Sequence, residues 1–527
     1  MIFQFLDDAS NASNAHMCKQ WSDFALDMLW REVKDLYHLL SILAPLEGAT
    51  NCLHVLTCRM GFSKLESSDW RNFERYCWRV RRLAYYTPGT SHALQQSMYD
   101  DIAHFQTSLD RLSSLHTLEW NTSLSSCVMF MHKNVKTFAV TLSPGALGIE
   151  PLFDDKLTLP QFCLTTKLAE FVSHVDNLES IAFQYFEEQG RGNPSDVVPF
   201  KPILAQESFP SLWDLSITVS FDDAARFLDQ SFAPTNITTL YLDSSRLETP
   251  ADFLHLITTI TSNCQLLKTL ALVSYIDASS TPAPATTDDT SQRITLDTLR
   301  PLLKCPNLTS LEIVHHHPLG LQHADIEELA RAWPAAESLL LNTEPADLIH
   351  SPLTLRALLP FAQHCPNLRA LGLFLDATAT ADLELELGPE VQTPQFKALR
   401  RLAMGVSLLD DASTGAAALF LSRLCPERSN LKLDSGITWD EMQEPGLAQG
   451  LVETVQGRCE RWERVVEMMP LLVRLRGEER RRARALQMEV EDLRWRNEVL
   501  VEMAKAKAGR GGGGSGSGGA GDGCVAA

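Results

Sequence analysis

Residues 305–313 read CPNLTSLEI and residues 365–373 read CPNLRALGL. Each stretch contains a six-residue phrase in which the first, fourth and sixth positions are apolar. The phrase recurs along most of the chain from about residue 115. Its copies are Leu115-Leu118-Trp120, Val135-Phe138-Val140, Leu178-Ile181-Phe183, Leu212-Leu215-Ile217, Ile237-Leu240-Leu242, Leu267-Leu270-Leu272, Leu308-Leu311-Ile313, Ala336-Leu339-Leu341, Leu368-Leu371-Leu373, Leu399-Leu402-Met404 and the degraded Leu431-Leu433.

The spacing of these phrases indicates a repeat architecture. From Leu178 to Leu399 they begin 25 to 41 residues apart, which is typical of leucine-rich repeats at the long end of their period. Amphipathic segments at 296–303, 325–333 and 355–361 predict helices that return the chain to the next strand. Each such unit buries its apolar face only against its neighbours. We therefore predict an α/β fold over residues 111–440, an irregular leucine-rich-repeat solenoid of parallel strands with returning helices.

Cysteine marks the point before several phrases. Three of these cysteines are followed by proline, which ends the preceding helix because it cannot continue one. A metal site is an alternative role for the set, but regular repeats place its members in separate turns, so we predict buried structural thiols. The four are Cys264, Cys305, Cys365 and, with Arg428 in the opening position of its phrase, Cys425.

Composition limits the class of protein. The chain has 527 residues, too many for one compact core, and its 45% hydrophobic and 21% charged residues are ordinary for a soluble globular protein. A formal net charge of −20 disfavours general nucleic-acid binding, which needs a basic surface. Neither a signal peptide nor a transmembrane helix is predicted, and none of the 12 cysteines forms a C-x-x-C pair, so we expect free thiols in a reducing compartment.

Enzyme motifs are missing from the sequence. No G-x-S-x-G, H-E-x-x-H or P-loop pattern occurs. His315, His316 and His317 follow a strand phrase, and we favour a solvated turn there over a metal site. We therefore expect no enzyme, no catalytic residue, no cofactor and no bound metal.

The last 80 residues follow a different pattern. Residues 448–508 predict C-terminal helices interrupted at Pro470, with a second apolar phase that could form a short coiled coil and mediate self-association. If Leu486 is a d position, Asn497 is an a position, where asparagine can fix the register of a dimer. Residues 509–527 are glycine-rich and predict a disordered tail. The second phase consists of Leu486, Val490, Leu493, Asn497, Leu500 and Ala504.

Residues 1–40 predict a small all-helical unit, and residues 41–110 a helical connector to the repeats. The segment 2–36, IFQFLDDASNASNAHMCKQWSDFALDMLWREVKDL, resembles the F-box as found in fungal F-box proteins. Three family phrases match it: I-F-x-x-L-D, V-C-K-x-W without its valine, and L-W-R-x-V. They fall at Ile2, Phe3, Leu6 and Asp7, at Cys18, Lys19 and Trp21, and at Leu29, Trp30, Arg31 and Val33.

The segment departs from the family pattern in two places. The family's leucine–proline opening is absent, and Asn11 stands where an apolar residue is usual. Loss of a large apolar anchor costs ~2 kcal/mol or more at an interface, so adaptor binding would be weakened or lost. A start codon further upstream in the gene explains the truncation equally well.

The resemblance implies the substrate-receptor subunit of a Skp–cullin–F-box ubiquitin ligase. The repeats would hold a target protein, and catalysis would belong to other subunits, with the rate gained through proximity. The alternative is a leucine-rich-repeat interaction scaffold without ligase docking. Skp-adaptor contacts would come from Ile2, Phe3, Leu6, Cys18, Trp21, Leu29 and Trp30, although Trp21 and Trp30 would equally fit the core of the helical unit.

Variable positions inside the phrases are predicted to face the concave side of the solenoid, where a substrate would bind. The candidates are Glu119, Gln184, Asp214, Thr239, Lys268, Glu312 and Arg369.

The last four residues fit the C-a-a-X pattern, with alanine favouring farnesylation of Cys524. No dense basic stretch adjoins Cys524, and one prenyl chain gives only marginal membrane binding. An unmodified cysteine is the alternative, and we expect a cytoplasmic or nuclear protein.

Overall fold

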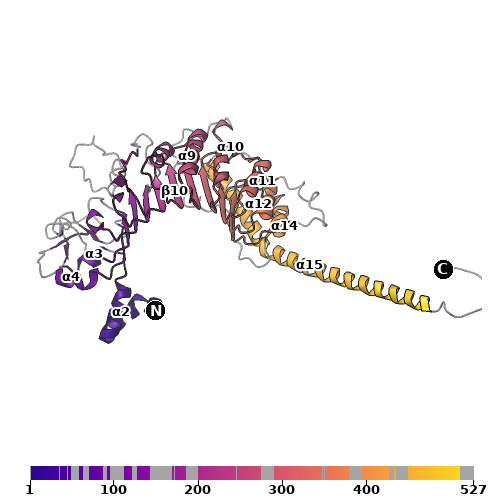
Figure 1. The fold of residues 1–527 in the computed structure, drawn as a ribbon, viewed down its shortest axis with the longest axis horizontal. Coiled ribbons are helices and arrows are strands. Elements are labelled where there is room, and N and C mark those ends of the chain that lie inside the picture. Colours follow the sequence, from indigo (N-terminus) through magenta and orange to yellow (C-terminus); the bar gives the residue numbers. More distant parts are fainter. Residues whose placement is uncertain are drawn as a thin grey trace, which may run out of the picture.

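The computed structural model describes residues 2–34, 36–43, 46–48, 58–62, 70–86, 92–94, 102, 112–121, 127–142, 169–170, 172–185, 200–244, 246–274, 290–346, 348, 351–378, 394–425, 432–434 and 449–510. Its central part is an arc, with the strands lining the inner side and the helices the outer side (Figure 1). A long C-terminal helix extends from one end of the arc, and the short helices of the N-terminal region lie at the other end (Figure 1).

One parallel sheet of thirteen strands forms the inner wall of the arc. The order of its strands follows the chain, so each repeat adds one strand beside the previous one, and the predicted α/β solenoid of leucine-rich repeats is confirmed. The strands are β1 (Glu32–Val33), β4 (Arg82–Tyr86), β6 (Thr117–Asn121), β7 (Thr137–Leu142), β8 (Ser180–Tyr185), β9 (Asp214–Thr218), β10 (Thr239–Ser244), β11 (Thr269–Ser274), β12 (Ser310–His315), β13 (Ser338–Leu341), β14 (Ala370–Leu373), β15 (Arg401–Ala403) and β16 (Lys432–Asp434). A separate small sheet joins β2 (Leu46–Gly48), β3 (Cys58–Phe62) and β5 (His92–Leu94).

The phrase explains the register. Its fourth position falls in one row across neighbouring strands, and its side chains are buried against the outer helices because alternate residues of a strand point to opposite faces. Leucine at this position in repeat after repeat builds one continuous core rather than several. The row contains Leu215, Leu240, Leu270, Leu311, Leu339, Leu371 and Leu402.

Helices return the chain along the outer side of the arc. Thr249 and Asp252 form a capping box at the start of α9, and Pro250 occupies its first turn, where no backbone donor is lost. The segments are η3 (Val128–Phe130), α8 (Phe221–Leu228), α9 (Pro250–Asn263), η6 (Thr290–Gln292), α10 (Leu296–Leu299), η7 (Arg300–Lys304), α11 (His323–Ala332), η8 (Leu355–Ala357), α12 (Leu358–His364) and α14 (Thr414–Leu424).

The repeat cysteines lie at the ends of these returning segments. Cys264, Cys305, Cys365 and Cys425 are C-cap residues, and all four are buried free thiols, as predicted. The thiol of Cys365 donates to the carbonyl oxygens of Ala330, at 3.5 Å, and of Trp333, at 3.4 Å. A small residue with a weak donor thus joins the end of one helix to the helix of the preceding repeat.

The N-terminal region contains η1 (Ile2–Phe5), α1 (Asp8–Met17), α2 (Lys19–Leu29), α3 (Leu36–Leu40) and α4 (Trp70–Cys77). Our expectation of a helical connector over 41–110 was wrong, because β2, β3, β4 and β5 lie there. The unit over 1–40 is not all-helical either, because β1 lies in it and pairs with β4, which in turn pairs with β6. The phrase Val80-Leu83-Tyr85 builds β4, and all three side chains are buried. Sequence analysis did not recognise this copy of the phrase.

One helix, α15 (Gln449–Arg510), replaces the interrupted helices expected near the C-terminus. It continues through Pro470 for 62 residues. Proline removes one backbone donor and normally breaks a helix interior. Here Pro470 is exposed, and Val465 and Met469 anchor the preceding turns in the core, so packing outweighs the lost bond.

Among the helices that the structure describes, none combines the length and the apolar character that crossing a bilayer requires.

Candidate binding surfaces

The inner face of the sheet carries a row of hydroxyl groups. The residues that begin the strands are paired across the sheet, and all are partly exposed. Ser180 donates a 2.6 Å hydrogen bond to Asp214, the one acid in the row. Asp214 and Thr239, both sequence candidates, are direct neighbours. The row consists of Thr117, Thr137, Ser180, Asp214, Thr239, Thr269, Ser310 and Ser338.

A second row, two residues further along each strand, is built largely from small side chains. At Gly372 an added Cβ would lie 2.9 Å from Cδ2 of Leu340 and 2.5 Å from Cγ2 of Thr343, so no larger residue fits there without movement. Small side chains fill most positions of the row, and a few large side chains stand between them. It runs Ala84, Glu119, Ala139, Ala182, Ser216, Tyr241, Ala271, Glu312, Leu340, Gly372 and Ala403.

Two acidic candidates of this row differ in surroundings. Glu119 forms a 2.7 Å ion pair with Arg82 of the neighbouring strand. Glu312 lies between Ala271 and Leu340, and burial raises the pKa of its carboxyl, an effect that the charge of Arg401 partly offsets. Five strands separate Glu119 from Glu312, so the two do not form one site.

The remaining candidates lie elsewhere on the sheet. Lys268 and Arg369 each precede a strand, and Arg369 forms a 3.0 Å ion pair with Glu337. Gln184 belongs to β8, but its side chain lies outside the part that the structure describes. The sequence thus identified the inner face, but the candidates are spread along the sheet rather than gathered at one point.

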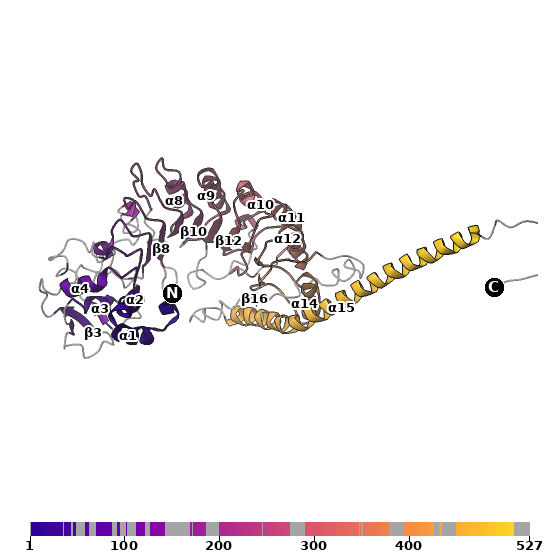
Figure 2. The same ribbon diagram turned by 60° about the horizontal axis from the view of Figure 1, so that its bottom comes forward.

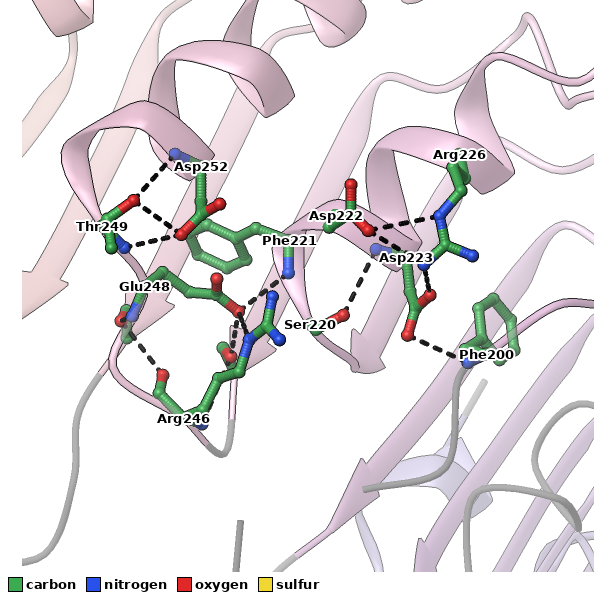
Figure 3. Close-up of polar contacts among 12 residues, drawn as sticks. Phe200, Ser220, Phe221, Asp222, Asp223, Arg226, Arg246, Glu248, Thr249 and Asp252 are labelled. Carbon is green, nitrogen blue, oxygen red and sulfur yellow. Dashed lines mark hydrogen bonds and ion pairs between the residues drawn. The ribbon is translucent and has the colours of Figure 1, made fainter. Parts of the chain in front are cut away.

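Buried polar residues organise the loops at the ends of the strands. The carboxylate of Glu248 accepts hydrogen bonds from the backbone N–H of Phe221 (2.9 Å), the hydroxyl of Ser244 (2.6 Å) and Nε of Arg246 (3.0 Å) (Figure 3). The backbone N–H of Glu248 donates to the hydroxyl of Ser274 at 2.8 Å. Through its carboxylate and its backbone N–H, Glu248 therefore joins the loops of three adjacent repeats. Sequence analysis missed it, because an acid after a strand gives no signal of burial.

A second buried carboxylate, that of Asp223, joins two segments one repeat earlier. Asp223 accepts a 3.1 Å hydrogen bond from the backbone N–H of Phe200 and pairs with Arg226, while its own N–H donates to the N-cap hydroxyl of Ser220 (Figure 3). The ring of Phe200 packs against Phe227 with centroids 5.5 Å apart. This contact ties the segment before β9 to the helix that follows it.

His315 also lies at the end of a strand. The prediction of a solvated turn at 315–317 was wrong for this residue. It ends β12, is buried, and receives a 3.2 Å hydrogen bond at Nδ1 from the N–H of His317, while Nε2 lies 3.2 Å from the carbonyl oxygen of Glu248. With its proton on Nε2, the neutral ring donates to Glu248 and accepts from the N–H of His317, whose carbonyl oxygen also lies 3.2 Å from Nδ1. Burial lowers the pKa of His315 to about 4. Among the described residues, no group of three potential ligands is placed to hold a metal ion.

A second candidate surface lies on the N-terminal helices. The ring of Phe3 packs edge-on against Trp21, with centroids 6.1 Å apart, and stacks on Phe24 at 6.2 Å. Trp21 is 48% exposed, Phe24 57% and Phe5 88%, which is unusual for aromatic side chains in a folded unit. Met17, at the end of α1, is exposed as well. We call Phe3, Phe5, Trp21 and Phe24 the aromatic cluster.

The structure distinguishes the two tryptophans that sequence analysis could not. Trp21 is exposed, whereas Trp30 packs against the core and lies 5.4 Å from the ring of Tyr76. Leu6 and Cys18 are exposed, Leu29 is partly buried, and the side chain of Ile2 lies outside the described part. Phe5, Met17 and Phe24 were not among the sequence candidates; Phe24, three residues after Trp21, could have been found from helical spacing.

Asn11 fixes the segment that carries Phe3 and Phe5 of the aromatic cluster. Its buried side-chain amide donates to the carbonyl oxygens of Phe3, at 3.2 Å, and Leu6, at 3.3 Å. Asparagine at this position, where the F-box pattern has an apolar residue, thus holds the η1 turn on α1.

A buried arginine fixes these helices to the sheet. Arg79 donates to the carbonyl oxygen of Asp23 (2.9 Å) and its carboxylate (3.0 Å), and also pairs with Asp27. Directly after α2, β1 joins the sheet beside β4. The aromatic cluster is therefore held at one end of the repeat array.

Comparisons with known proteins add little. No protein-family model matches the chain, and no curated protein matches it either. Among solved structures, a chain in the crystal structure of the Rad7 and Elc1 complex in yeast is similar over 52% of this chain, with 14% sequence identity and a TM-score of 0.28. The match spans 64% of the yeast chain, less than two thirds of it. A superposition this loose carries no argument about function.

The two surfaces suit different kinds of contact. The aromatic cluster is apolar and prominent, so it favours a partner that buries rings. The sheet face combines a row of mainly hydroxyl side chains with a row of mostly small side chains along many strands, which favours an extended protein surface over a small molecule. Cys524 lies outside the described residues, so its prenylation stays a prediction.

Proposed function

We propose that this chain is a substrate receptor whose N-terminal helices dock a Skp-type adaptor of a cullin ubiquitin ligase and whose repeat sheet binds a target protein. The observation that carries the proposal is the aromatic cluster. Phe5, Trp21 and Phe24 are exposed on the N-terminal helices, which are joined to the rest of the described chain through Arg79, Trp30 and β1.

The physical argument starts from the cost of exposed rings. Contiguous apolar patches on soluble proteins mark interaction surfaces, and aromatic anchors dominate the free energy of binding. The rings of Trp21 and Phe24 both contact Phe3, so they are partly ordered before a partner arrives. Such preorganisation reduces the entropy that is lost on docking.

The attachment of the cluster supports a receptor rather than a free module. Arg79 holds α2 through both Asp23 and Asp27, and β1 extends the sheet itself. A bound adaptor would therefore keep a defined position relative to a target on the inner face. In this proposal the chain performs no chemistry, and the ubiquitin transfer is accelerated by proximity alone.

Co-purification of the full-length chain with a recombinant Skp-type adaptor tests the proposal. We expect Trp21→Ala combined with Phe24→Ala to abolish the complex. Trp213→Ala is the matched control, since Trp213 is also an exposed tryptophan, 42% accessible, but lies beside β9 of the repeat array. No complex with the unmodified chain, or equal binding by the double variant, would reject adaptor docking and leave a repeat scaffold as the function.

A further inference from the structure

The distal part of α15 extends from the arc without contact to it. In both views the helix passes α14 and then leaves the molecule (Figures 1 and 2). From 481 to 506 nearly every side chain is exposed, large apolar ones included. The most exposed are Leu486 (62%), Met488 (70%), Leu493 (55%), Trp495 (64%), Leu500 (64%) and Met503 (64%).

The proximal part of the same helix explains why this segment is helical at all. Trp462, Val465 and Met469 are buried in the main core, so the helix is already formed before residue 481. Nucleation is the costly step in helix formation, and adding further turns is cheap. The packed half therefore keeps the distal half helical before any partner covers its apolar face.

The apolar residues of the distal segment follow a heptad. Leu486, Leu493 and Leu500 occupy d positions, and Val490, Asn497 and Ala504 occupy a positions. Leucine at d with a β-branched residue at a favours two parallel strands, and a single asparagine at a fixes their register.

The polar residues also favour a second copy of this chain. In a parallel pair, Asn497 meets Asn497 of the other copy, and the two amides can bond to each other. An antiparallel pair would set Asn497 against a leucine and leave a buried amide unpaired, which is costly. Glu489 at g would lie opposite Arg494 at e of the other copy, and within the described chain neither forms an ion pair.

We propose that residues 486–504 form a parallel, in-register, two-stranded coiled coil with a second copy of this chain. Met488 and Trp495 fall at f positions, on the side away from the second copy, and stay exposed in the dimer. The parallel arrangement puts both repeat arrays at the same end of the coil. Two inner faces could then engage one target, which raises avidity without any new contact. The inference does not depend on adaptor docking.

Sedimentation of the full-length chain over a range of concentrations tests association. We expect a monomer–dimer equilibrium that Leu493→Lys abolishes and Trp495→Lys leaves unchanged. Both variants place the same charge on an exposed site of one helix, so a folding defect would affect both alike. A monomer at every concentration overturns the proposal, and so does a dimer that Trp495→Lys dissolves, because the opposite face would then be the contact.

Oxidative cross-linking tests orientation. Asn497→Cys should yield a reducible dimer well above the background of the parental chain, whose 12 cysteines set the baseline. Trp495→Cys, at the outer position, should stay at that baseline. Equal cross-linking of the two variants, or none by Asn497→Cys in a protein that sediments as a dimer, would reject the parallel register.

Discussion

The indole N–H of Trp462 donates a 2.9 Å hydrogen bond to the carbonyl oxygen of Ser407, 55 residues earlier in the chain. The hydroxyl of Ser407 in turn donates to the carbonyl oxygen of Leu373, at 3.1 Å, and accepts from the N–H of Leu375, at 3.0 Å. Trp462 and Ser407 are both fully buried. Repeat arrays need a cap because their last unit has no neighbour to cover its core. The proximal half of α15 is that cap.

Trp462→Ala is expected to destabilise the array strongly. It opens a cavity in the core and leaves the carbonyl of Ser407 unpaired, and truncating a buried tryptophan typically costs ~3–5 kcal/mol. Urea denaturation followed by tryptophan fluorescence and circular dichroism measures the effect. Trp495→Ala, on the exposed part of the same helix, is the control and should change stability by no more than about 0.5 kcal/mol. Equal midpoints for the two variants would contradict a capping role.

Glu248→Ala should loosen the edge of the sheet. The change removes the acceptor for the N–H of Phe221 and the hydroxyl of Ser244, both buried. Each buried group left unpaired costs about 1–3 kcal/mol, so we expect a loss of at least about 2 kcal/mol in the free energy of unfolding. Asp252→Ala, which removes only a partly exposed cap of α9, should cost about 1 kcal/mol. A smaller loss for Glu248→Ala than for Asp252→Ala would argue against this role of Glu248.

The sequence predicted the sheet well, because the six-residue phrase specifies both the strand and its buried side. All eleven phrases coincide with strands, from β6 to β16. Two strands of this sheet were missed: β1, which has only two residues, and β4, whose phrase Val80-Leu83-Tyr85 was not recognised. Pro470 predicted an interruption that the structure does not have, since packing of the neighbouring turns keeps the helix intact.

The binding surfaces were harder to predict for a physical reason. Helical spacing shows that Trp21 and Trp30 belong to a stripe, but not which part of the stripe another element covers. Tyr76, which packs on Trp30, lies 46 residues away in the chain. Likewise, no residue near Glu248 in sequence indicates that Phe221 and Ser274 will form hydrogen bonds with it. Such sites depend on contacts between repeats, and the repeat pattern records only the apolar ones.

His315 should make the protein less stable in mild acid. Burial holds its pKa near 4 in the folded state, against 6.5 in the unfolded chain. Between these values the unfolded state binds a proton that the folded state does not, so stability falls as the pH drops from 6.5 towards 4. By the 1.36 kcal/mol per pKa unit of linkage, the full loss is about 3 kcal/mol.

Denaturation midpoints at pH 7 and pH 5 for the parental chain and for His315→Gln measure this contribution. Glutamine can still reach a carbonyl oxygen but has no titrating group. The variant should lose less stability between the two pH values than the parent, whatever its stability at pH 7. An identical pH dependence would show that His315 does not titrate in this range.

The thiols of the repeats should resist alkylation as long as the array is folded. Burial raises the pKa of Cys264 and Cys425 to about 12, and only the thiolate is nucleophilic. Cys18 is exposed at the start of α2 and is the internal control. Iodoacetamide labelling at pH 8, read by mass spectrometry, should modify Cys18 within the time that leaves both repeat cysteines unmodified, and adding urea should remove the difference. Labelling of Cys264 as fast as Cys18 in the native protein would mean that the repeats open far more often than their continuous core implies.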